Sequence, residues 1–325
     1  MYEVKLHDAT ELDFLAFSSL QKQSFAQLLT DVKISDDFMS PDFFRWKYNP
    51  PIKTAKIAVV YEGKEMVASN AMMPCEVSSK NEKITGWQSC DTATLPKARG
   101  KGCFLKCLHL LKSSIDKNDV FFGFPNKNST HGFYKSGCRP IVDVPTWLSP
   151  VSFLLARKSS HISTITRFDK HQDIFAQTYS HKSTPMVYRD SQYLNWRYTS
   201  HPKHSYTLFN YVKNGRYLGY AVVRQASIMG RNFCLVMEKL GETPSIEREL
   251  LRHINHWAVK QHMWHSLTMD TCLPLWSGIL SGYFPVPQKI APKKQVLMAQ
   301  AMGGALADTI CENPWRAQLG DWDAF

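Results

Sequence analysis

Residues 99–102, Arg-Gly-Lys-Gly, form the segment of the sequence best suited to chemistry. Glycine lets the backbone approach a bulky anion closely, so that several N–H groups can converge on it. Before the loop the residues alternate as a strand as far as Pro96; after it, apolar residues recur at helical spacing, at Phe104, Leu108, Leu111 and Ile115. The pattern predicts a strand, a glycine loop and a helix N-terminus, which together favour phosphate binding. Neither GxxxxGK(S/T) nor GxGxxG is present, which argues against a P-loop and a dinucleotide fingerprint.

A second segment, residues 120–137, reads as the next strand and helix. An apolar run is followed by Asn126, Ser129 and Tyr134. The loop, written Pro-x-x-Arg-Gly-Lys-Gly from Pro96, resembles the acyl-CoA pyrophosphate loop R-G-x-G-x-(G/A) of the GNAT (GCN5-related N-acetyltransferase) superfamily. The second segment resembles the strand and the tyrosine-bearing helix that follow in that family. Phe104 stands where the last small residue of the family motif would be.

The resemblance implies particular roles for residues of this chain. Backbone amides of the loop would hold the coenzyme pyrophosphate, and backbone groups of Thr92 and Thr94 would hold the pantetheine arm. Tyr134 would protonate the leaving thiolate, with a core position as its alternative. Asp91 is our candidate for the general base, with a structural hydrogen-bonding role as its alternative. The cofactor-binding residues expected on this basis are Thr92, Thr94, Arg99, Gly100, Lys101, Gly102, Cys103, Asn126 and Ser129.

An internal repeat extends over most of the chain. Residues 42–48, Asp-Phe-Phe-Arg-Trp-Lys-Tyr, return as residues 192–198, Gln-Tyr-Leu-Asn-Trp-Arg-Tyr, and each copy continues into a strand, a glycine turn and a strand. Both copies also end alike, at residues 135–140 and 280–285. The second copy lacks the glycine-arginine loop, and its Glu242 and Glu247 would repel phosphate. We therefore expect the second copy to be a scaffold that completes the acceptor cleft.

These elements predict an α/β (α+β) fold of two tandem GNAT-like domains, each a mixed sheet with flanking helices. A chain of 325 residues is long enough for its core to divide in two. The expected boundaries are residues 1–150 for the acyl-CoA-binding domain, 151–184 for a connecting segment and 185–325 for the second domain. Residues 318–325, acidic and aromatic, are expected to form a packed terminal strand.

Composition restricts the class of protein and its partners. With 44% hydrophobic and 21% charged residues, the chain is neither a disordered polymer nor a coiled coil. The formal net charge of +11 favours anionic partners, and the scattered basic residues argue against RNA as the main one. The sequence has no apolar run of membrane-spanning length, no secretory signal and no CxxC pair among its eight cysteines. These features predict a cytoplasmic protein with reduced thiols.

Four histidines, His253, His256, His262 and His265, are the closest approach to a metal signature. They lie one helical turn apart in pairs, but no carboxylate occupies the register of an HExxH motif. We expect a solvated histidine-rich helix there and no metal site.

The predicted function is that of an acyl-CoA-dependent N-acyltransferase, most simply an acetyltransferase using acetyl-CoA, with an amino sugar as one acceptor that the resemblance suggests. One alternative is an aminoacyl-tRNA-dependent transferase of the FemAB type, which also has tandem units. Another is a non-catalytic acyl-CoA-binding or assembly protein. The sequence leaves the acceptor, the acyl length and the oligomeric state open.

Overall fold

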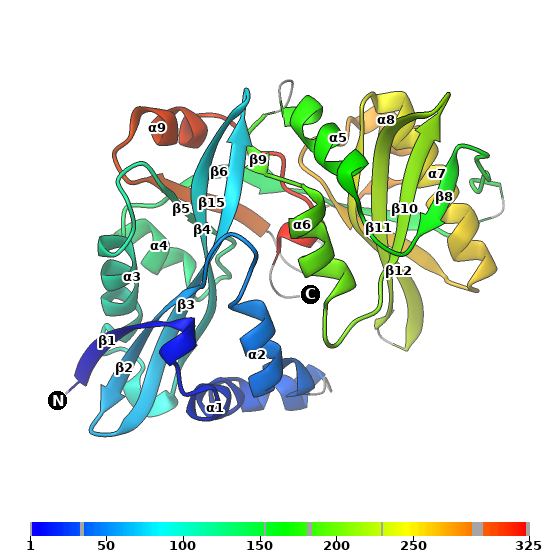
Figure 1. The fold of residues 1–325 in the computed structure, drawn as a ribbon. Helices are drawn as coiled ribbons and strands as arrows, with labels where there is room; N and C mark the ends of the chain where they lie inside the picture. Colours follow the sequence, from blue (N-terminus) through cyan, green and yellow to red (C-terminus); the bar gives the residue numbers. More distant parts are fainter. Residues whose placement is uncertain are drawn as a thin grey trace.

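The computed structural model describes residues 2–32, 36–152, 154–180, 184–228, 230–287 and 295–322. The chain forms two mixed β-sheets, one in each half of the molecule, with helices packed on them (Figure 1). This is the tandem α/β architecture that the sequence predicts. Within the residues described, no helix has the length and apolar character needed to cross a membrane.

The first sheet has the strand order β1-β2-β3-β4-β5-β15-β6, and the short β9 pairs with β3. β4 runs parallel to β5, whereas β3 and β15, their other neighbours, are antiparallel to them. The strands are β1 (Tyr2–Asp8), β2 (Lys56–Glu62), β3 (Glu65–Ser79), β4 (Glu82–Thr94), β5 (Val120–Gly123), β6 (Arg139–Val144), β9 (Met186–Val187) and β15 (Gln295–Ala301). The helices of this half are α1 (Phe14–Val32), α2 (Pro41–Lys47), α3 (Cys103–Ser113) and α4 (Thr130–Lys135).

The second sheet has the order β14-β7-β13-β12-β11-β10-β8. Here β12 and β13 are the parallel pair, and α7 connects them as α3 connects β4 and β5. The strands are β7 (Thr146–Pro150), β8 (Ile162–Ile165), β10 (Thr207–Lys213), β11 (Arg216–Ile228), β12 (Arg231–Gly241), β13 (His265–Met269) and β14 (Phe284–Pro285). The helices are α5 (Lys170–Ser180), α6 (Ser191–Leu194) with the π turn η4 (Asn195–Thr199), α7 (Pro244–Lys260) and α8 (Leu275–Leu280), and α9 (Ala305–Glu312) packs against β15.

Strands cross between the halves in both directions, and one of them is the short β9, which pairs with β3 of the first sheet. β6 and β7 are consecutive, with only Pro145 between them, but β6 lies in the first sheet and β7 pairs with β13 in the second. In return, β15 lies between β5 and β6. The segment 151–184, expected to be a connection, supplies β8 and α5 to the second half. The sheets therefore do not follow the expected domain boundaries at residues 150 and 185. Long-range strand pairing decides which sheet a strand joins.

The internal repeat is a structural repeat, and part of it lies where the halves meet. Trp46 in α2 and Trp196 in η4 stack with ring centroids 5.3 Å apart. The indole Nε1 of each donates to the carbonyl oxygen of the other at 3.3 Å. Such reciprocal contacts between equivalent residues are typical of a two-fold relation. The ends of the copies match as well, since Cys138 N–H bonds the Phe133 carbonyl after α4 and Tyr283 N–H bonds the Gly278 carbonyl after α8.

The helices near the predicted site cover opposite faces of the first sheet. In β2, Ala58 and Val60 belong to the same buried cluster as α3, whereas Ile57 and Val59 belong to the cluster of α1 and α2. This follows from the alternation of side chains along a strand. The first sheet is therefore enclosed by α3 on one side and by α1 and α2 on the other.

Residues 318–321 are buried, but these residues do not form the strand expected for residues 318–325. Residues 319–321 form the 3-10 turn η5 (Leu319–Asp321), and only Gln318 makes a β-bridge, with Asp270. The Asp321 carboxylate accepts from the Gln318 amide at 2.8 Å and from the Arg189 guanidinium at 2.5 Å. These side-chain bonds take the place of a strand ladder. Residues 323–325 lie outside the described residues.

Candidate functional site

The loop predicted to bind phosphate lies between the 3-10 turn η3 (Pro96–Ala98) and the N-terminus of α3. β4 ends at Thr94 and α3 begins at Cys103, in agreement with the sequence pattern. Gly100 and Gly102 both have a φ of +74°, which side chains disfavour. Left-handed residues in a tight turn let successive N–H groups converge, as in anion-binding nests.

The main-chain amides of residues 100 to 105 find no acceptor within the described ranges. On either side of this run, Arg99 N–H bonds the Pro96 carbonyl and Lys106 N–H bonds the Gly102 carbonyl. A helix leaves its first amides unpaired, and its dipole makes them attractive to an anion. A Cβ on Gly100 or Gly102 would meet nothing within 4 Å, so the space beside both glycines is open. Adjacent donors and an open approach are what a bound diphosphate requires.

Phe104, the departure from the family motif, does not close this space. Its ring packs on α4, where a Cβ on Gly132 would lie only 2.3 Å from the ring atom Cε1. The ring centroid also lies 6.3 Å from that of Phe133. Gly132 therefore gives the Phe104 ring a place against α4, away from the two loop glycines.

The charged side chains of the loop are exposed, whereas its cysteine is buried. Arg99 Nε donates to the Thr94 carbonyl at 3.3 Å. Lys101 Nζ donates to the Tyr2 hydroxyl at 2.9 Å, and this bond raises the pKa of Lys101. The Cys103 thiol contacts the Ala98 carbonyl inside the protein, at 3.7 Å. Cys103 can therefore face a ligand only through its main-chain amide, while the two cations can move to meet a phosphate.

β4 and β5 part next to this loop. Their pairing runs from Gly86 with Val120 to Ser89 with Gly123, and β4 then continues to Thr94. Leu95 N–H bonds the Val67 carbonyl of β3 at 2.9 Å. Because hydrogen-bonded residues alternate along an antiparallel pair, the main-chain groups of Thr94 point away from β3, to the side on which β5 has ended.

Asp91 lies at a β-bulge of β4, with a φ of +47°. Its Oδ2 accepts from the Tyr48 hydroxyl at 2.8 Å and lies 2.7 Å from Lys47 Nζ. Gln21 of α1 donates to the Asp91 carbonyl at 2.9 Å. A bulge redirects a side chain, and here it turns Asp91 towards α1 and α2. These contacts suit the hydrogen-bonding alternative, and the role of Asp91 as a base stays a prediction.

Asn126 and Ser129 build the turn that starts α4. Asn126 Oδ1 accepts from the amides of Asn128 and Ser129, at 2.9 and 3.2 Å, and Ser129 Oγ accepts from the Asn126 amide at 3.0 Å. The Asn126 side-chain oxygen is thus engaged, and its NH₂ group is the part left for a ligand. Tyr134 is 52% exposed, so the core position considered for it is wrong.

Sequence reasoning missed a buried polar group beside the point where β4 and β5 part. Asn70 of β3 is fully buried, and its Nδ2 donates to Ser89 Oγ at 3.1 Å and to Thr92 Oγ1. An asparagine inside the apolar run of residues 66–73 was the available signal, because a buried amide must find partners. The network fixes Thr92 next to the bulge at Asp91.

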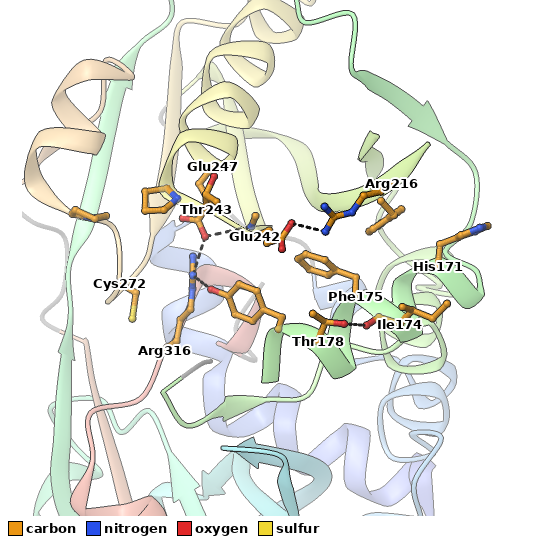
Figure 2. Close-up of a pocket in the computed structure, with 15 residues that line it drawn as sticks. His171, Ile174, Phe175, Thr178, Arg216, Glu242, Thr243, Glu247, Cys272 and Arg316 are labelled. Atoms are coloured by element: carbon orange, nitrogen blue, oxygen red, sulfur yellow. Dashed lines mark hydrogen bonds and ion pairs between the residues drawn. The ribbon is translucent and has the colours of Figure 1, made fainter. Parts of the chain in front are cut away.

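The second half has a pocket of about 420 Å³ at the corresponding place, beside the end of β12 and the start of α7. Figure 2 shows Phe175 and Thr178 of α5 on one side and Glu242, Thr243 and Glu247 on the other. The pocket contains none of the residues predicted for the site.

The N-terminus of α7 is closed by side chains of its own half. Thr243 Oγ1 accepts from the Ile246 amide, and Glu247 Oε1 accepts from the Gly241 amide, both at 3.4 Å. The Glu247 carboxylate also pairs with Lys239 at 2.8 Å and with Arg316 at 2.9 Å. Burial alone would raise the pKa of Glu247, but the two cations outweigh it and lower the pKa. An ionised carboxylate therefore stands at this helix terminus, as the acidic sequence of the second copy led us to expect.

His253 departs from the expected solvated histidine helix. It is buried against Phe209, with ring centroids 5.4 Å apart, and its Nδ1 accepts from the Ser159 amide at 3.2 Å. Burial first, and then His256 and Lys158, lower the pKa of His253 to about 4. In the part of the chain that the structure describes, no group of three or more His, Cys, Asp or Glu could hold a metal ion.

No family model and no curated protein matches the sequence. Solved structures match its fold. A GCN5-related N-acetyltransferase from Anabaena variabilis has a TM-score of 0.66 at 10% identity, over 92% of this chain and 73% of that one. A probable N-acyltransferase from Enterococcus faecalis has a TM-score of 0.64 at 13% identity, over 93% and 73%. N-myristoyltransferase from Saccharomyces cerevisiae, with bound myristoyl-CoA, has a TM-score of 0.59 at 9% identity, over 92% and 82%. The likeness is one of fold and extends over nearly the whole chain.

Proposed function

We propose that this chain, which has the GNAT fold in a tandem arrangement, is an acyl-CoA-dependent N-acyltransferase. The observation that carries the proposal is the run of unpaired amides at residues 100 to 105, at the start of α3 and in front of open space. A hydrogen bond to a charged group contributes about 1.5 to 3 kcal/mol. A few such bonds are enough to hold a coenzyme pyrophosphate.

Different residues around the loop would bind different parts of acyl-CoA. The amides of Gly100, Lys101, Gly102 and Cys103 would bond the pyrophosphate, and Arg99 would add its charge. The main-chain groups of Thr94 face the side on which β5 has ended, where they would bond the pantetheine arm together with those of Thr92. The NH₂ group of Asn126 would bond a pantetheine amide. Bound acyl-CoA would supply the thioester that an amine attacks.

Tyr134 would donate a proton to the departing thiolate. Its side chain is half-exposed, and α4 lies beside α3 through the contact of Phe104 with Gly132. A tyrosine hydroxyl is among the side chains that can act as a general acid. Positioned acid catalysis contributes about 100-fold to 10,000-fold in rate.

The proton of the attacking amine would go to Asp91. Oδ2 is engaged by Tyr48 and Lys47, so Oδ1 would be the accepting atom. The second half would act as a scaffold that completes the acceptor cleft, and an amino sugar is one acceptor of the right chemistry. All eight cysteines are free thiols, which fits a cytoplasmic location.

Coenzyme binding is the first test. In a thermal-shift assay, CoA, acetyl-CoA and myristoyl-CoA should each raise the melting temperature of the wild type, because a ligand that binds only the folded state stabilises that state. Gly102→Ala should weaken this binding about tenfold or more, since a Cβ strains the turn and enters the space of the ligand. Gly215→Ala is the matched control, because Gly215 has a φ of +72° and equally open surroundings in the second half. If no coenzyme shifts the wild type, the proposal fails.

Turnover is the second test, followed as free thiol released from acyl-CoA with a panel of amines. Tyr134→Phe should lower kcat and leave coenzyme affinity unchanged, whereas Arg99→Glu should lower affinity. A coenzyme-binding protein without activity on any amine would indicate the binding or assembly role instead. Activity only with aminoacyl-tRNA would indicate the FemAB-type alternative.

A further inference from the structure

The helix α8 presents its large apolar side chains to solvent. Its buried residues are Ser277 and Gly278, whereas Leu275, Trp276 and Leu280 are 51%, 73% and 54% exposed. A Cβ on Gly278 would lie 2.8 Å from the ring of Trp147 in β7, so the helix rests on the second sheet through its backbone. Surface helices normally do the reverse and bury their apolar side. The exposed side chains of α8 are therefore not explained by packing of the fold.

A neighbouring residue adds to this exposed apolar surface. Leu154 in the loop after β7 is 81% exposed. Leu155 packs on Gly282, where a Cβ would lie 2.6 Å from Leu155 Cδ1, and this contact brings the loop to the end of α8. We call the set Leu154, Leu275, Trp276 and Leu280 the α8 patch. Large apolar side chains exposed together in this way mark an interaction site.

Cations border the α8 patch. The Arg252 guanidinium bonds the Leu280 carbonyl through Nη2 at 2.8 Å and Nε at 3.3 Å. Arg157 N–H bonds the Arg252 carbonyl at 3.1 Å, which places Arg157 and its neighbour Lys158 beside Arg252 of α7. The two segments that supply the patch, residues 144–168 and 271–307, contain no Asp or Glu in the sequence. Glu249 of α7 is engaged by the hydroxyls of Ser159 and Tyr211.

We propose that the α8 patch docks the protein on an anionic lipid bilayer. Exposed Trp and Leu side chains can enter the acyl boundary while neighbouring Arg and Lys meet the headgroups. Addition of a peptide strand fits less well, because β14 has only two residues and one of them is Pro285.

Vesicle flotation of the full chain tests this. The protein should float with vesicles of phosphatidylcholine and phosphatidylserine, float less with phosphatidylcholine alone, and be released in part by salt. The double variant Trp276→Ser, Leu280→Ser should lower partition about tenfold or more. The control Leu15→Ser, Ile174→Ser removes side chains of similar exposure, 70% and 61%, elsewhere and should bind as the wild type does. Arg157→Gln with Lys158→Gln should reduce only the dependence on phosphatidylserine.

Three results would overturn the proposal. In the first, the wild type does not float with either vesicle. In the second, the control Leu15→Ser, Ile174→Ser loses binding as much as Trp276→Ser, Leu280→Ser does. In the third, sedimentation velocity shows a wild-type dimer that Trp276→Ser converts to monomer while no vesicle is bound, which would make the patch a self-association surface. Far-UV circular dichroism of each variant confirms that a lost interaction is not lost folding. Because Trp276 is largely exposed, its replacement should leave the fold intact.

Discussion

The N-termini of α3 and α7 occupy the same place in the two halves, each after the first strand of the parallel pair of its sheet, but they are built in opposite ways. At α3 the N-cap is Gly102, without a capping side chain, and the amides of residues 100 to 105 have no acceptor among the residues that the structure describes. At α7 the N-cap is Thr243, and the Glu247 carboxylate bonds the Gly241 amide. The N-terminus of α7 is therefore next to a carboxylate of its own chain, whereas the N-terminus of α3 presents its amides to solvent.

The closed terminus is part of a balanced buried cluster. Lys239 pairs with Glu247 and Asp270, and Arg316 pairs with the same two carboxylates. Burial alone would raise the pKa of Asp270, but Arg316 and Lys239 lower it, so both acids stay charged. Two cations and two anions leave no net charge for a ligand to neutralise. We therefore expect an anion to bind at the N-terminus of α3, where no carboxylate of the described residues caps the helix, and not at the N-terminus of α7.

Breaking the closed terminus should have the largest effect. Glu247→Ala leaves Lys239 and Arg316 buried with one acid fewer, and should lower the free energy of unfolding by about 3 to 5 kcal/mol. Urea unfolding followed by fluorescence measures this. The control is Glu242→Ala, whose pair with the exposed Arg216 is 3.5 Å long and should be worth less than about 1 kcal/mol. Equal losses in the two variants would contradict the distinction.

Reversing a charge at the open terminus should affect binding and not stability. Arg99→Glu should weaken acyl-CoA binding by about tenfold to 100-fold, because it removes one charge-assisted bond and adds a repulsive charge. The free energy of unfolding should change by no more than about 0.5 kcal/mol, since Arg99 is exposed. Isothermal titration calorimetry and urea unfolding measure the two quantities. Arg216→Glu, at the pocket of the second half, should leave affinity unchanged, and a similar loss there would show that only overall charge matters.

The open terminus could be predicted because its signals are local. Pro96, the loop glycines and the helical spacing place the end of β4 and the start of α3. The apolar stripe was less accurate. Leu108 and Leu111 are fully buried, but Phe104 is only partly buried and Ile115 lies beyond the end of α3. The repeat could also be recognised in the sequence, because Trp46 and Trp196 are equivalent residues that make the same contact in the two copies.

The rest depends on contacts between residues far apart in the chain. The exchange of β7 and β15 follows from pairing across the halves, which strand patterns do not specify. The direction of Asp91 is set by a bulge opposite β3, where alternation gives no guide. Arg316, which lies just before the segment expected to form a strand, reaches Asp270 at the end of β13. A charged residue near such a segment does not reveal which distant acid it will meet.

The two helices also differ in their histidines, and this gives the smallest expected effect. His253 of α7 is buried with a pKa of about 4, beside His256 and Lys158, whereas His109 of α3 is exposed. In the unfolded state, His253 has the ordinary histidine pKa of about 6.5. Its contribution to stability is therefore complete above about pH 6.5 and is lost as the pH falls towards about 4.

Replacing His253 should flatten the dependence of stability on pH. When the pH falls from about 7.5 to about 5.5, the free energy of unfolding should drop by up to about 1 kcal/mol less in His253→Gln than in the wild type. The reason is that the variant has no buried imidazole that takes up a proton only on unfolding. Urea unfolding at a series of pH values measures the difference. His109→Gln is the control and should follow the wild-type profile, since the ring of His109 is exposed. Parallel profiles for His253→Gln and the wild type would mean that the ring of His253 is protonated without cost, and that α7 is less tightly packed there than its contacts with Phe209 and Ser159 imply.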